Sequence, residues 1–272
     1  MPNTIILTFN DVDAEKSEII IALLETAGFD AFEEKENQLI ACIAESNYDE
    51  DVMRELLAPF SMGYQKEISV PRNWNAEWEQ QYQPVVIEKF AGIRADFHTP
   101  LSDVQYEIII TPKMSFGTGH HDTTRLMMMA MRNMDFVNKQ VFDFGTGTGV
   151  LAILASMLGA NEIDAMDIDD WVVDNAKENI EKNKTDNVGV FIGDAPLLHK
   201  KYDIVLANIN RHILLDHMLH MSRILNPGGY VLMSGFYETD IPVLVSAADQ
   251  AGLQKLHQNI SNNWTCLLLQ LK

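Results

Sequence analysis

The 272-residue sequence has few cysteines, few basic residues and no long apolar run. Its two cysteines, Cys42 and Cys266, lie far apart and form no paired ligand motif, which fits a reducing compartment and argues against a structural zinc site. The longest mainly apolar stretch, Val150 to Leu158, is far shorter than the ~20 residues that a membrane span needs, and no secretory leader is evident. We therefore expect a cytoplasmic protein that does not contact a membrane.

Basic residues are the scarcer charged type, with 20 Lys and Arg against 39 Asp and Glu, a net charge of −19. Residues 1–70 hold fifteen acidic and four basic residues, a net charge of −11. A surface this acidic repels phosphate backbones, so we expect no direct binding of nucleic acid. Attraction of a basic partner and simple solubility both explain the charge, and charge alone does not separate them.

The first 70 residues alternate between strand patterns and helix patterns. Strand-like segments at 3–10, 38–45 and 64–70 are separated by helix-like segments at 13–30 and 49–60. This order predicts a small α+β domain of the ferredoxin type, which carries no chemical motif and is therefore expected to serve for contact. Residues 71–90 follow as a linker helix, in which Trp74, Trp78 and Tyr82 share one face before Pro84.

Residues 91–272 carry the pattern of a larger domain. From Gln140 onward, strand-like and helix-like segments alternate regularly. Alternation of this kind predicts a doubly wound, Rossmann-like α/β domain with a parallel sheet covered by helices on both faces. Ligands bind such sheets at the carboxyl ends of the strands, where the strand order reverses.

A glycine turn follows the first of these strands, with Gly145, Gly147 and Gly149 spaced two residues apart. A dinucleotide fingerprint needs its third glycine one position later, where this sequence has Val150, and the lysine of a phosphate-binding loop is absent. Glycines allow the backbone to approach a ligand closely, and Asp143 at the strand end is able to accept a hydrogen bond from a cationic amine. The turn therefore suits a ligand without phosphates.

Two further strand ends carry carboxylates. Asp167 lies eighteen residues beyond Gly149, where a carboxylate accepts hydrogen bonds from both ribose hydroxyls of an adenosine. Asp194 follows the third strand, where an acid accepts a hydrogen bond from an adenine amino group, although Asp194 alone is also compatible with an ordinary loop residue. Taken together, the three strand ends predict a site for adenosine.

This half of the chain resembles the class I S-adenosylmethionine-dependent methyltransferases. In that class the fourth strand end faces the transferred methyl group, and here it reads "LANINRH", with Asn208 at its start. Relatives with Asn-Pro-Pro-Tyr at this position methylate planar nitrogens and stack the acceptor on the aromatic ring. This chain lacks both the prolines and the ring, which disfavours a planar acceptor.

Three segments make the resemblance more specific: "NWNAEWEQQYQP" (73–84), "SFGTGHHDTTRL" (115–126) and "LNPGGYVLMSGF" (225–236) are similar to the ribosomal protein L11 methyltransferase family. The resemblance implies S-adenosylmethionine as cofactor, methylation of lysine ε-amines and the N-terminal α-amine of ribosomal protein L11, and a role for residues 1–70 as the substrate-recognition domain. The oligomeric state is open, with a monomer as the default. The resemblance places cofactor contacts at Thr124, Gly145, Asp167 and Asn208, to which the residue patterns add Gly147 and Asp194. Asn208 is also the candidate to orient the amine. The continuation "NINRHIL" departs from the commoner "NIL".

Two other functions stay open at this point: a class I methyltransferase that acts on another protein or a small amine, and a non-catalytic module that retains the cofactor pocket. His120 and His121 are candidates for a general base or for closing the pocket. His217 and His220 are better explained as surface or core residues than as metal ligands, and no metal site is predicted. Trp264, at the start of a final strand, is expected to cover the far side of the pocket.

Overall fold

The computed structural model describes residues 3–60, 62–69, 82–113, 115–194 and 200–272. The chain divides into two compact units, Met1–Gln81 and Tyr82–Lys272. Within the described residues, no helix is both long enough and apolar enough to cross a membrane.

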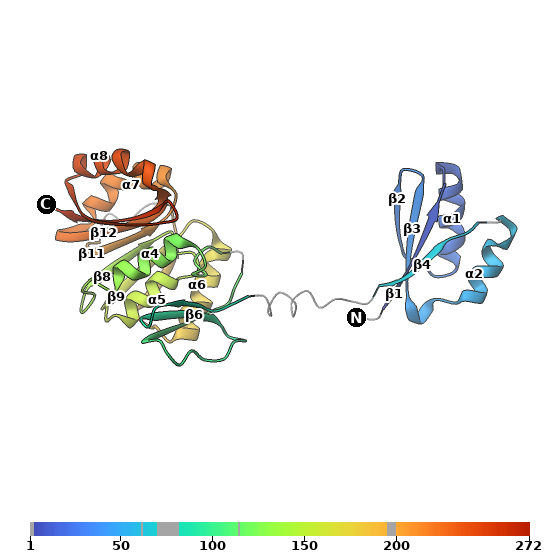
Figure 1. Ribbon diagram of the computed structural model, residues 1–272, viewed down its shortest axis with the longest axis horizontal. Helices are drawn as coiled ribbons and strands as arrows, with labels where there is room; N and C mark the ends of the chain where they lie inside the picture. The colour runs from blue at the N-terminus through green and yellow to red at the C-terminus, as the bar shows by residue number, and fades with distance from the viewer. Residues whose placement is uncertain (1–2, 61, 70–81, 114, 195–199) are drawn as a thin grey trace. The chain divides into compact units, whose positions relative to one another are not determined.

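The first unit has the order strand, helix, strand, strand, helix, strand. Its four antiparallel strands lie in the order β2-β3-β1-β4, and α1 and α2 lie on one face of the sheet (Figure 1). This is the predicted ferredoxin-like arrangement, with one strand, β2, that the sequence pattern missed. The elements are β1 (Thr4–Asn10), α1 (Ala14–Thr26), β2 (Ala31–Lys35), β3 (Gln38–Ala44), α2 (Glu50–Leu57) and β4 (Gln65–Ser69).

Buried and partly exposed residues alternate along β1 and β3, and the buried ones form the core of this unit. Ile5, Leu7 and Phe9 of β1 are buried against Ile20 and Leu24 of α1, whereas the residues between them are partly exposed. Both helices begin at aspartate caps, since the side chains of Asp13 and Asp49 accept backbone N–H groups of the first turn. Carboxylates at helix N-termini are also favoured by the helix dipole, so part of the acidic charge has a structural role.

The second unit begins with a three-stranded sheet and continues as the predicted doubly wound domain. The small sheet has the order β5-β6-β7. Its strands are β5 (Val85–Ile87), β6 (Ala91–Ala95) and β7 (Tyr106–Ile110). The remaining elements are α4 (Asp122–Met131), β8 (Gln140–Phe144), α5 (Val150–Met157), β9 (Glu162–Asp167), α6 (Asp170–Asn183), β10 (Val188–Ile192), β11 (Tyr202–Asn208), α7 (Arg211–Arg223), β12 (Leu225–Tyr237), α8 (Ile241–Gln250), β13 (Leu253–Ser261) and β14 (Trp264–Leu271).

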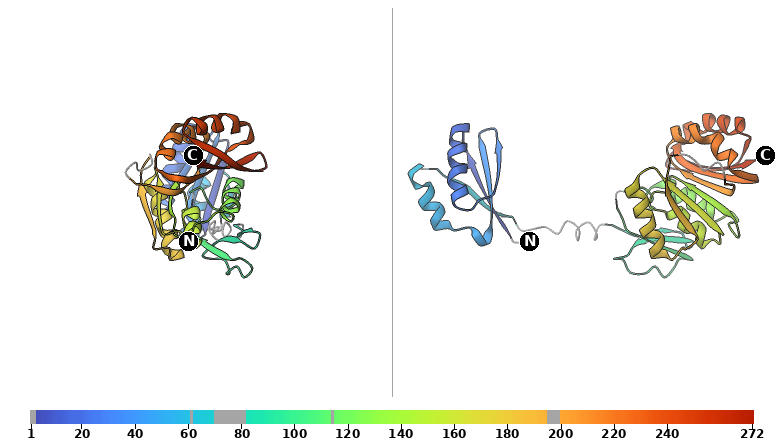
Figure 2. Two further views of the ribbon diagram at one scale, coloured as in Figure 1. Left: turned by 90° about the vertical axis from the view of Figure 1, so that its left-hand side faces the viewer. Right: turned by 180° about the vertical axis from the view of Figure 1, so that it is seen from behind.

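The large sheet has the order β10-β9-β8-β11-β12-β14-β13, in which only β14 runs antiparallel to its neighbours. One apolar cluster packs α4, α5 and α6 against one face, and a second packs α7 and α8 against the other (Figures 1 and 2). Met127, Met128 and Met131 of α4 are fully buried in the first cluster. The strand order reverses between β8 and β11, so a crevice is expected at their carboxyl ends.

The prediction of a linker helix over 71–90 is wrong for its C-terminal part. Val85–Ile87 form strand β5, paired antiparallel with β6, and belong to the second unit, which therefore begins before residue 91. Pro84 lacks an N–H group, and the β-branched residues that follow it favour an extended chain. Residues 70–81, including Trp74 and Trp78, lie outside the described residues.

Candidate active site

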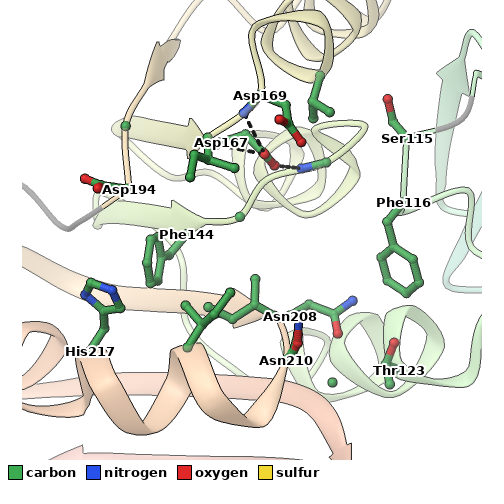
Figure 3. A pocket seen from close by; sticks show the side chains of 18 of the residues that line it. Ser115, Phe116, Thr123, Phe144, Asp167, Asp169, Asp194, Asn208, Asn210 and His217 are labelled. Atoms are coloured by element: carbon green, nitrogen blue, oxygen red, sulfur yellow. Dashed lines mark hydrogen bonds between the residues drawn. The ribbon is translucent and has the colours of Figure 1, made fainter.

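The carboxyl ends of β8, β9, β10 and β11 converge on one cavity of about 650 Å³ (Figure 3). It lies at the reversal of strand order, where the sheet topology predicts a ligand site. Five of the six cofactor-binding residues expected from the sequence line this cavity: Gly145, Gly147, Asp167, Asp194 and Asn208. The structure therefore brings these five predicted residues together at one edge of the sheet.

The glycine turn has a backbone that other residues adopt only at a cost. Gly145 and Gly147 have φ angles of 73° and 56°. A Cβ atom at Gly145 would overlap the Ile209 side chain, and one at Gly147 would overlap the carbonyl oxygen of Phe116. The turn therefore packs directly against Ile209 and Phe116, and both glycines also line the cavity.

The segment "FGTG" (116–119) packs on this turn. The backbone N–H of Thr148 donates to the Phe116 carbonyl at 2.9 Å, and Thr148 Oγ1 donates to the Gly117 carbonyl at 2.8 Å. Thr148 is fully buried, so these hydrogen bonds are shielded from water. The two glycine-rich segments, thirty residues apart in sequence, therefore form one continuous wall.

Asp167 holds the turn from the other side. Its Oδ2 atom accepts the backbone N–H of Gly147 at 3.0 Å, and its Oδ1 atom accepts the N–H of Ile168 at 2.9 Å. These bonds fix the carboxylate at the cavity wall, beside the glycine turn (Figure 3). Oδ1 also accepts the N–H of Asp169 in a long bond of 3.5 Å, whereas Oδ2 has a further lone pair, so Asp167 retains the capacity to accept a ligand hydroxyl group.

Asp143 does not reach the cavity, contrary to the expectation that it accepts a ligand amine. It is fully buried behind the turn, where its Oδ2 atom accepts the Thr146 hydroxyl at 2.6 Å. Burial raises its pKa to about 7, and the nearby charge of Asp167 acts in the same direction. Asp143 therefore supports the glycine turn from inside the protein.

Asn208 and Thr124 form a pair at the end of β11. Asn208 lines the cavity and its Nδ2 atom lies 3.4 Å from the hydroxyl of Thr124 on α4, a long hydrogen bond. Thr124 is fully buried and stands behind Asn208, whereas its neighbour Thr123 lines the cavity. Asn208 Oδ1 is buried without a hydrogen-bond partner among the residues that the structure describes. An unpaired acceptor of this kind indicates a place for a ligand donor.

Aromatic rings form the wall beside Asn208. His121 lies edge-to-face between Phe116, at 5.2 Å, and Trp264, at 4.7 Å between ring centroids. All three line the cavity, as expected for Trp264, and Tyr237 packs on the outer side of Trp264 at 4.2 Å. This wall is suited to an apolar chain that carries a neutral amine, because aromatic rings pack on apolar chains and exclude water.

Comparison with known proteins agrees with this geometry. The family model "Ribosomal protein L11 methyltransferase (PrmA)" matches residues 7–272. Two relatives described as ribosomal protein L11 methyltransferase are similar: that of Phocaeicola vulgatus is 40% identical over 264 residues, covering 94% of each chain, and that of Porphyromonas gingivalis is 42% identical over 258 residues, covering 92% of this chain and 89% of the relative.

The chain belongs to the ribosomal protein L11 methyltransferase family. A crystal structure of ribosomal protein L11 methylase from Lactobacillus delbrueckii subsp. bulgaricus superimposes with a TM-score of 0.64 at 29% identity, covering 70% of this chain and all of that one. The fold is therefore that of a class I methyltransferase, and the methyl donor is S-adenosylmethionine. The chain is an S-adenosylmethionine-dependent enzyme, as the sequence predicted.

The cavity of this family member fits such a donor. Three carboxylates line it, Asp167, Asp169 and Asp194, which suits the positive charges of a sulfonium and an α-amine. Asn208 offers an unpaired oxygen, and the backbone at Gly145 and Gly147 forms part of the cavity wall. No group of three or more potential metal ligands occurs within the described part of the chain.

The histidines differ in their relation to the cavity. His120 does not line it: Nε2 lies 2.9 Å from the Gln83 carbonyl oxygen, and Nδ1 lies 3.1 Å from Thr118 Oγ1. His121 does line it, but its Nδ1 atom accepts the N–H of Thr123 as the cap of α4. His121 therefore suits a position in the cavity wall better than a role in proton transfer. Of the two histidines on α7, His217 lines the cavity and His220 does not.

Several residues that line the cavity were not predicted from the sequence to do so. Ile168, Asp169 and Trp171 follow Asp167 directly, so adjacency to a strand-end acid would have identified them. Phe144 and His217 come from β8 and α7, and nothing in their local sequence marks them. They are brought together only by the packing of α7 on the sheet.

Proposed function

We propose that this protein transfers methyl groups from S-adenosylmethionine to lysine ε-amines and the N-terminal α-amine of ribosomal protein L11. The observation that carries the proposal is family membership over nearly the whole chain, together with a cavity lined both by Asn208, whose Oδ1 atom is unpaired, and by three aromatic rings. The donor supplies a methyl group bound to a positively charged sulfur. Everything else in the reaction depends on alignment and on the state of the amine.

Each part of the donor has a place in this proposal. Asp167 accepts the ribose hydroxyls, with its orientation fixed by Gly147. Asp194, at the end of β10, accepts the adenine amino group. The backbone at Gly145 lies along the nucleoside, and Thr124 acts through Asn208, which it holds at the methyl end.

The acceptor amine has to lose its proton before it attacks. A lysine has an ordinary pKa of about 10.4, so the neutral form costs roughly 4 kcal/mol near pH 7.5. A wall of Phe116, His121 and Trp264 excludes water beside a positive sulfur, and both effects disfavour the ammonium. Asn208 Oδ1 then accepts an N–H of the neutral amine and directs its lone pair at the methyl group.

We further propose that the first unit recognises the substrate. Residues 1–70 carry a net charge of −11, and the residues of β2 are mostly exposed, including Glu33 and Glu34. A lysine-rich protein is steered toward such a surface. A monomeric state and the lack of direct nucleic-acid contact stay predictions. A cytoplasmic location also stays a prediction, and it is expected because the proposed substrate is a ribosomal protein.

The test is a competition. Purified ribosomal protein L11 and several other lysine-rich ribosomal proteins from the same organism are incubated together with the enzyme and S-adenosylmethionine carrying a labelled methyl group. We expect label on L11 alone. Label on another protein instead would support a different protein substrate. A parallel reaction contains a small amine in place of the proteins, and label found only there would favour the small-amine alternative.

A further inference from the structure

One histidine of the cavity wall has no part in the steps above. His217 on α7 lines the cavity, and its ring lies edge-to-face with Phe144 at 5.2 Å between centroids. Figure 3 shows His217 and Phe144 on the same side of the cavity as Asp194, whereas Phe116 and Thr123 lie on the opposite side. His217 therefore lies at the end where Asp194 accepts the adenine amino group.

The position of His217 along α7 agrees with this. α7 begins at Arg211, three residues after Asn208, and six residues of helix correspond to about 9 Å. His217 is thus separated from the methyl end of the cavity by a distance on the order of a nucleoside.

The two ring nitrogens of His217 differ in environment. Nδ1 is fully buried and has no hydrogen-bond partner among the described residues, whereas Nε2 is not among the buried, unpaired atoms. An unpaired buried N–H group is rarer in proteins than an unpaired buried acceptor. The proton therefore belongs on Nε2, and His217 offers the cavity an N–H donor.

We propose that His217 donates this N–H to a ring nitrogen of adenine and is a specificity residue for the cofactor. The adenine edge has an amino donor and three ring nitrogens that accept. Asp194, an acceptor, matches the amino group but none of the ring nitrogens, which need a donor. His217 supplies that donor, so the two residues together match the donor and acceptor pattern of adenine.

His220 provides a matched control. It lies three residues further along the same helix, its ring is 5.5 Å from that of His217, and its Nδ1 atom is also buried without a partner within the part of α7 described. It does not line the cavity. A difference between variants at the two positions therefore reports contact with the cavity and not the burial of an imidazole.

The experiment is a calorimetric titration with S-adenosylhomocysteine and with three analogues in which N1, N3 or N7 of adenine is replaced by C–H. The wild type should bind one analogue about threefold to tenfold more weakly than the parent compound. H217F should bind the parent more weakly by a similar factor and lose the discrimination between parent and analogue. H220F should keep both the affinity and the discrimination.

Discrimination is a ratio measured within one protein, so partial unfolding of a variant does not imitate its loss. Equal affinity of the wild type for the parent and all three analogues would overturn the proposal, as would full discrimination by H217F. The inference rests on the proposed placement of adenine but not on the identity of the substrate. Titration of D194A with the parent and its 6-oxo analogue tests that placement separately. If D194A loses the preference for the amino group while H217F still discriminates between the parent and the ring analogues, the placement of adenine stands and only the role of His217 is removed.

Discussion

Gly147 and Asp167 are joined by a hydrogen bond of 3.0 Å from the backbone N–H of the first to Oδ2 of the second. The bond connects the turn after β8 to the end of β9, so the two strand ends that we propose to hold the nucleoside are fixed relative to each other before any ligand binds. A site organised in this way loses little entropy on binding. Substitutions at either residue should therefore affect cofactor affinity directly.

D167N should weaken the binding of S-adenosylhomocysteine by about tenfold to a hundredfold, because a charged acceptor is replaced by a neutral one of the same size. Isothermal calorimetry measures the change. D169N is the control, since Asp169 lines the same cavity without any bond to the glycine turn. Equal losses in the two variants would show that only the negative charge of the cavity matters.

N208A should lower kcat by about a hundredfold while changing the Kd of S-adenosylhomocysteine much less, because its proposed role is to orient the amine. Single-turnover kinetics on ribosomal protein L11 and calorimetry separate the two effects. T124V, which removes the hydroxyl that lies 3.4 Å from Asn208 Nδ2, should give a smaller loss of the same kind. Parallel loss of turnover and affinity in N208A would contradict the orienting role.

G147A should destabilise the second unit by about 2 kcal/mol, since a side chain at a φ of 56° is strained and the added Cβ meets the Phe116 carbonyl oxygen. The Tm should fall by about 4 to 8 °C. G63A is the control: a Cβ there meets nothing within 4 Å. A Tm for G147A within a degree of the wild type would mean that the turn adapts without cost.

Asp143 makes stability depend on pH. Its pKa is about 7 in the folded protein, above its ordinary value of 3.8, so the folded state binds the proton more tightly than the unfolded state. The resulting stabilisation is complete below pH 3.8 and is lost as pH rises to about 7. Relative to D143N, the wild type should lose up to roughly 4 kcal/mol over this range. Urea unfolding at several pH values measures it, and a difference between the two proteins that does not vary with pH would refute the assignment.

The charge of the first unit should act on the protein substrate only. E33K combined with E34K should raise the KM for ribosomal protein L11 several-fold at low salt and leave cofactor affinity unchanged, with the effect disappearing as salt increases. D103K, at an exposed position of the second unit, is the control. The same rise in KM for both variants would assign the effect to net charge.

The parallel sheet, its glycine turn and the acids after β9 and β10 were predictable because each depends on local sequence. A buried strand, a turn that needs positive φ and a polar residue at a strand end all leave short patterns. Strand β2 left none: Ala31–Lys35 is an exposed edge strand that pairs only with β3, so it lacks the alternation that a buried face imposes.

Side-chain direction was the part that the sequence did not determine. Asp143 is the penultimate residue of β8 and Asp167 the last of β9, yet the first carboxylate is buried behind the turn and the second lines the cavity. His217 and His220 are both buried in part on one helix, and only the packing of α7 on the sheet brings the first to the cavity. Such differences depend on a rotation of one side chain or one helix, which spacing does not encode.

The central claim is best tested by intact-mass spectrometry of purified ribosomal protein L11 from the same organism, incubated with the enzyme and S-adenosylmethionine. The wild type should add mass in steps of one methyl group, with the modified sites at lysines and the N-terminus, and D167A should add none. An unchanged mass of L11 with the wild type, under conditions in which S-adenosylhomocysteine binds the enzyme measurably, would contradict the proposed substrate.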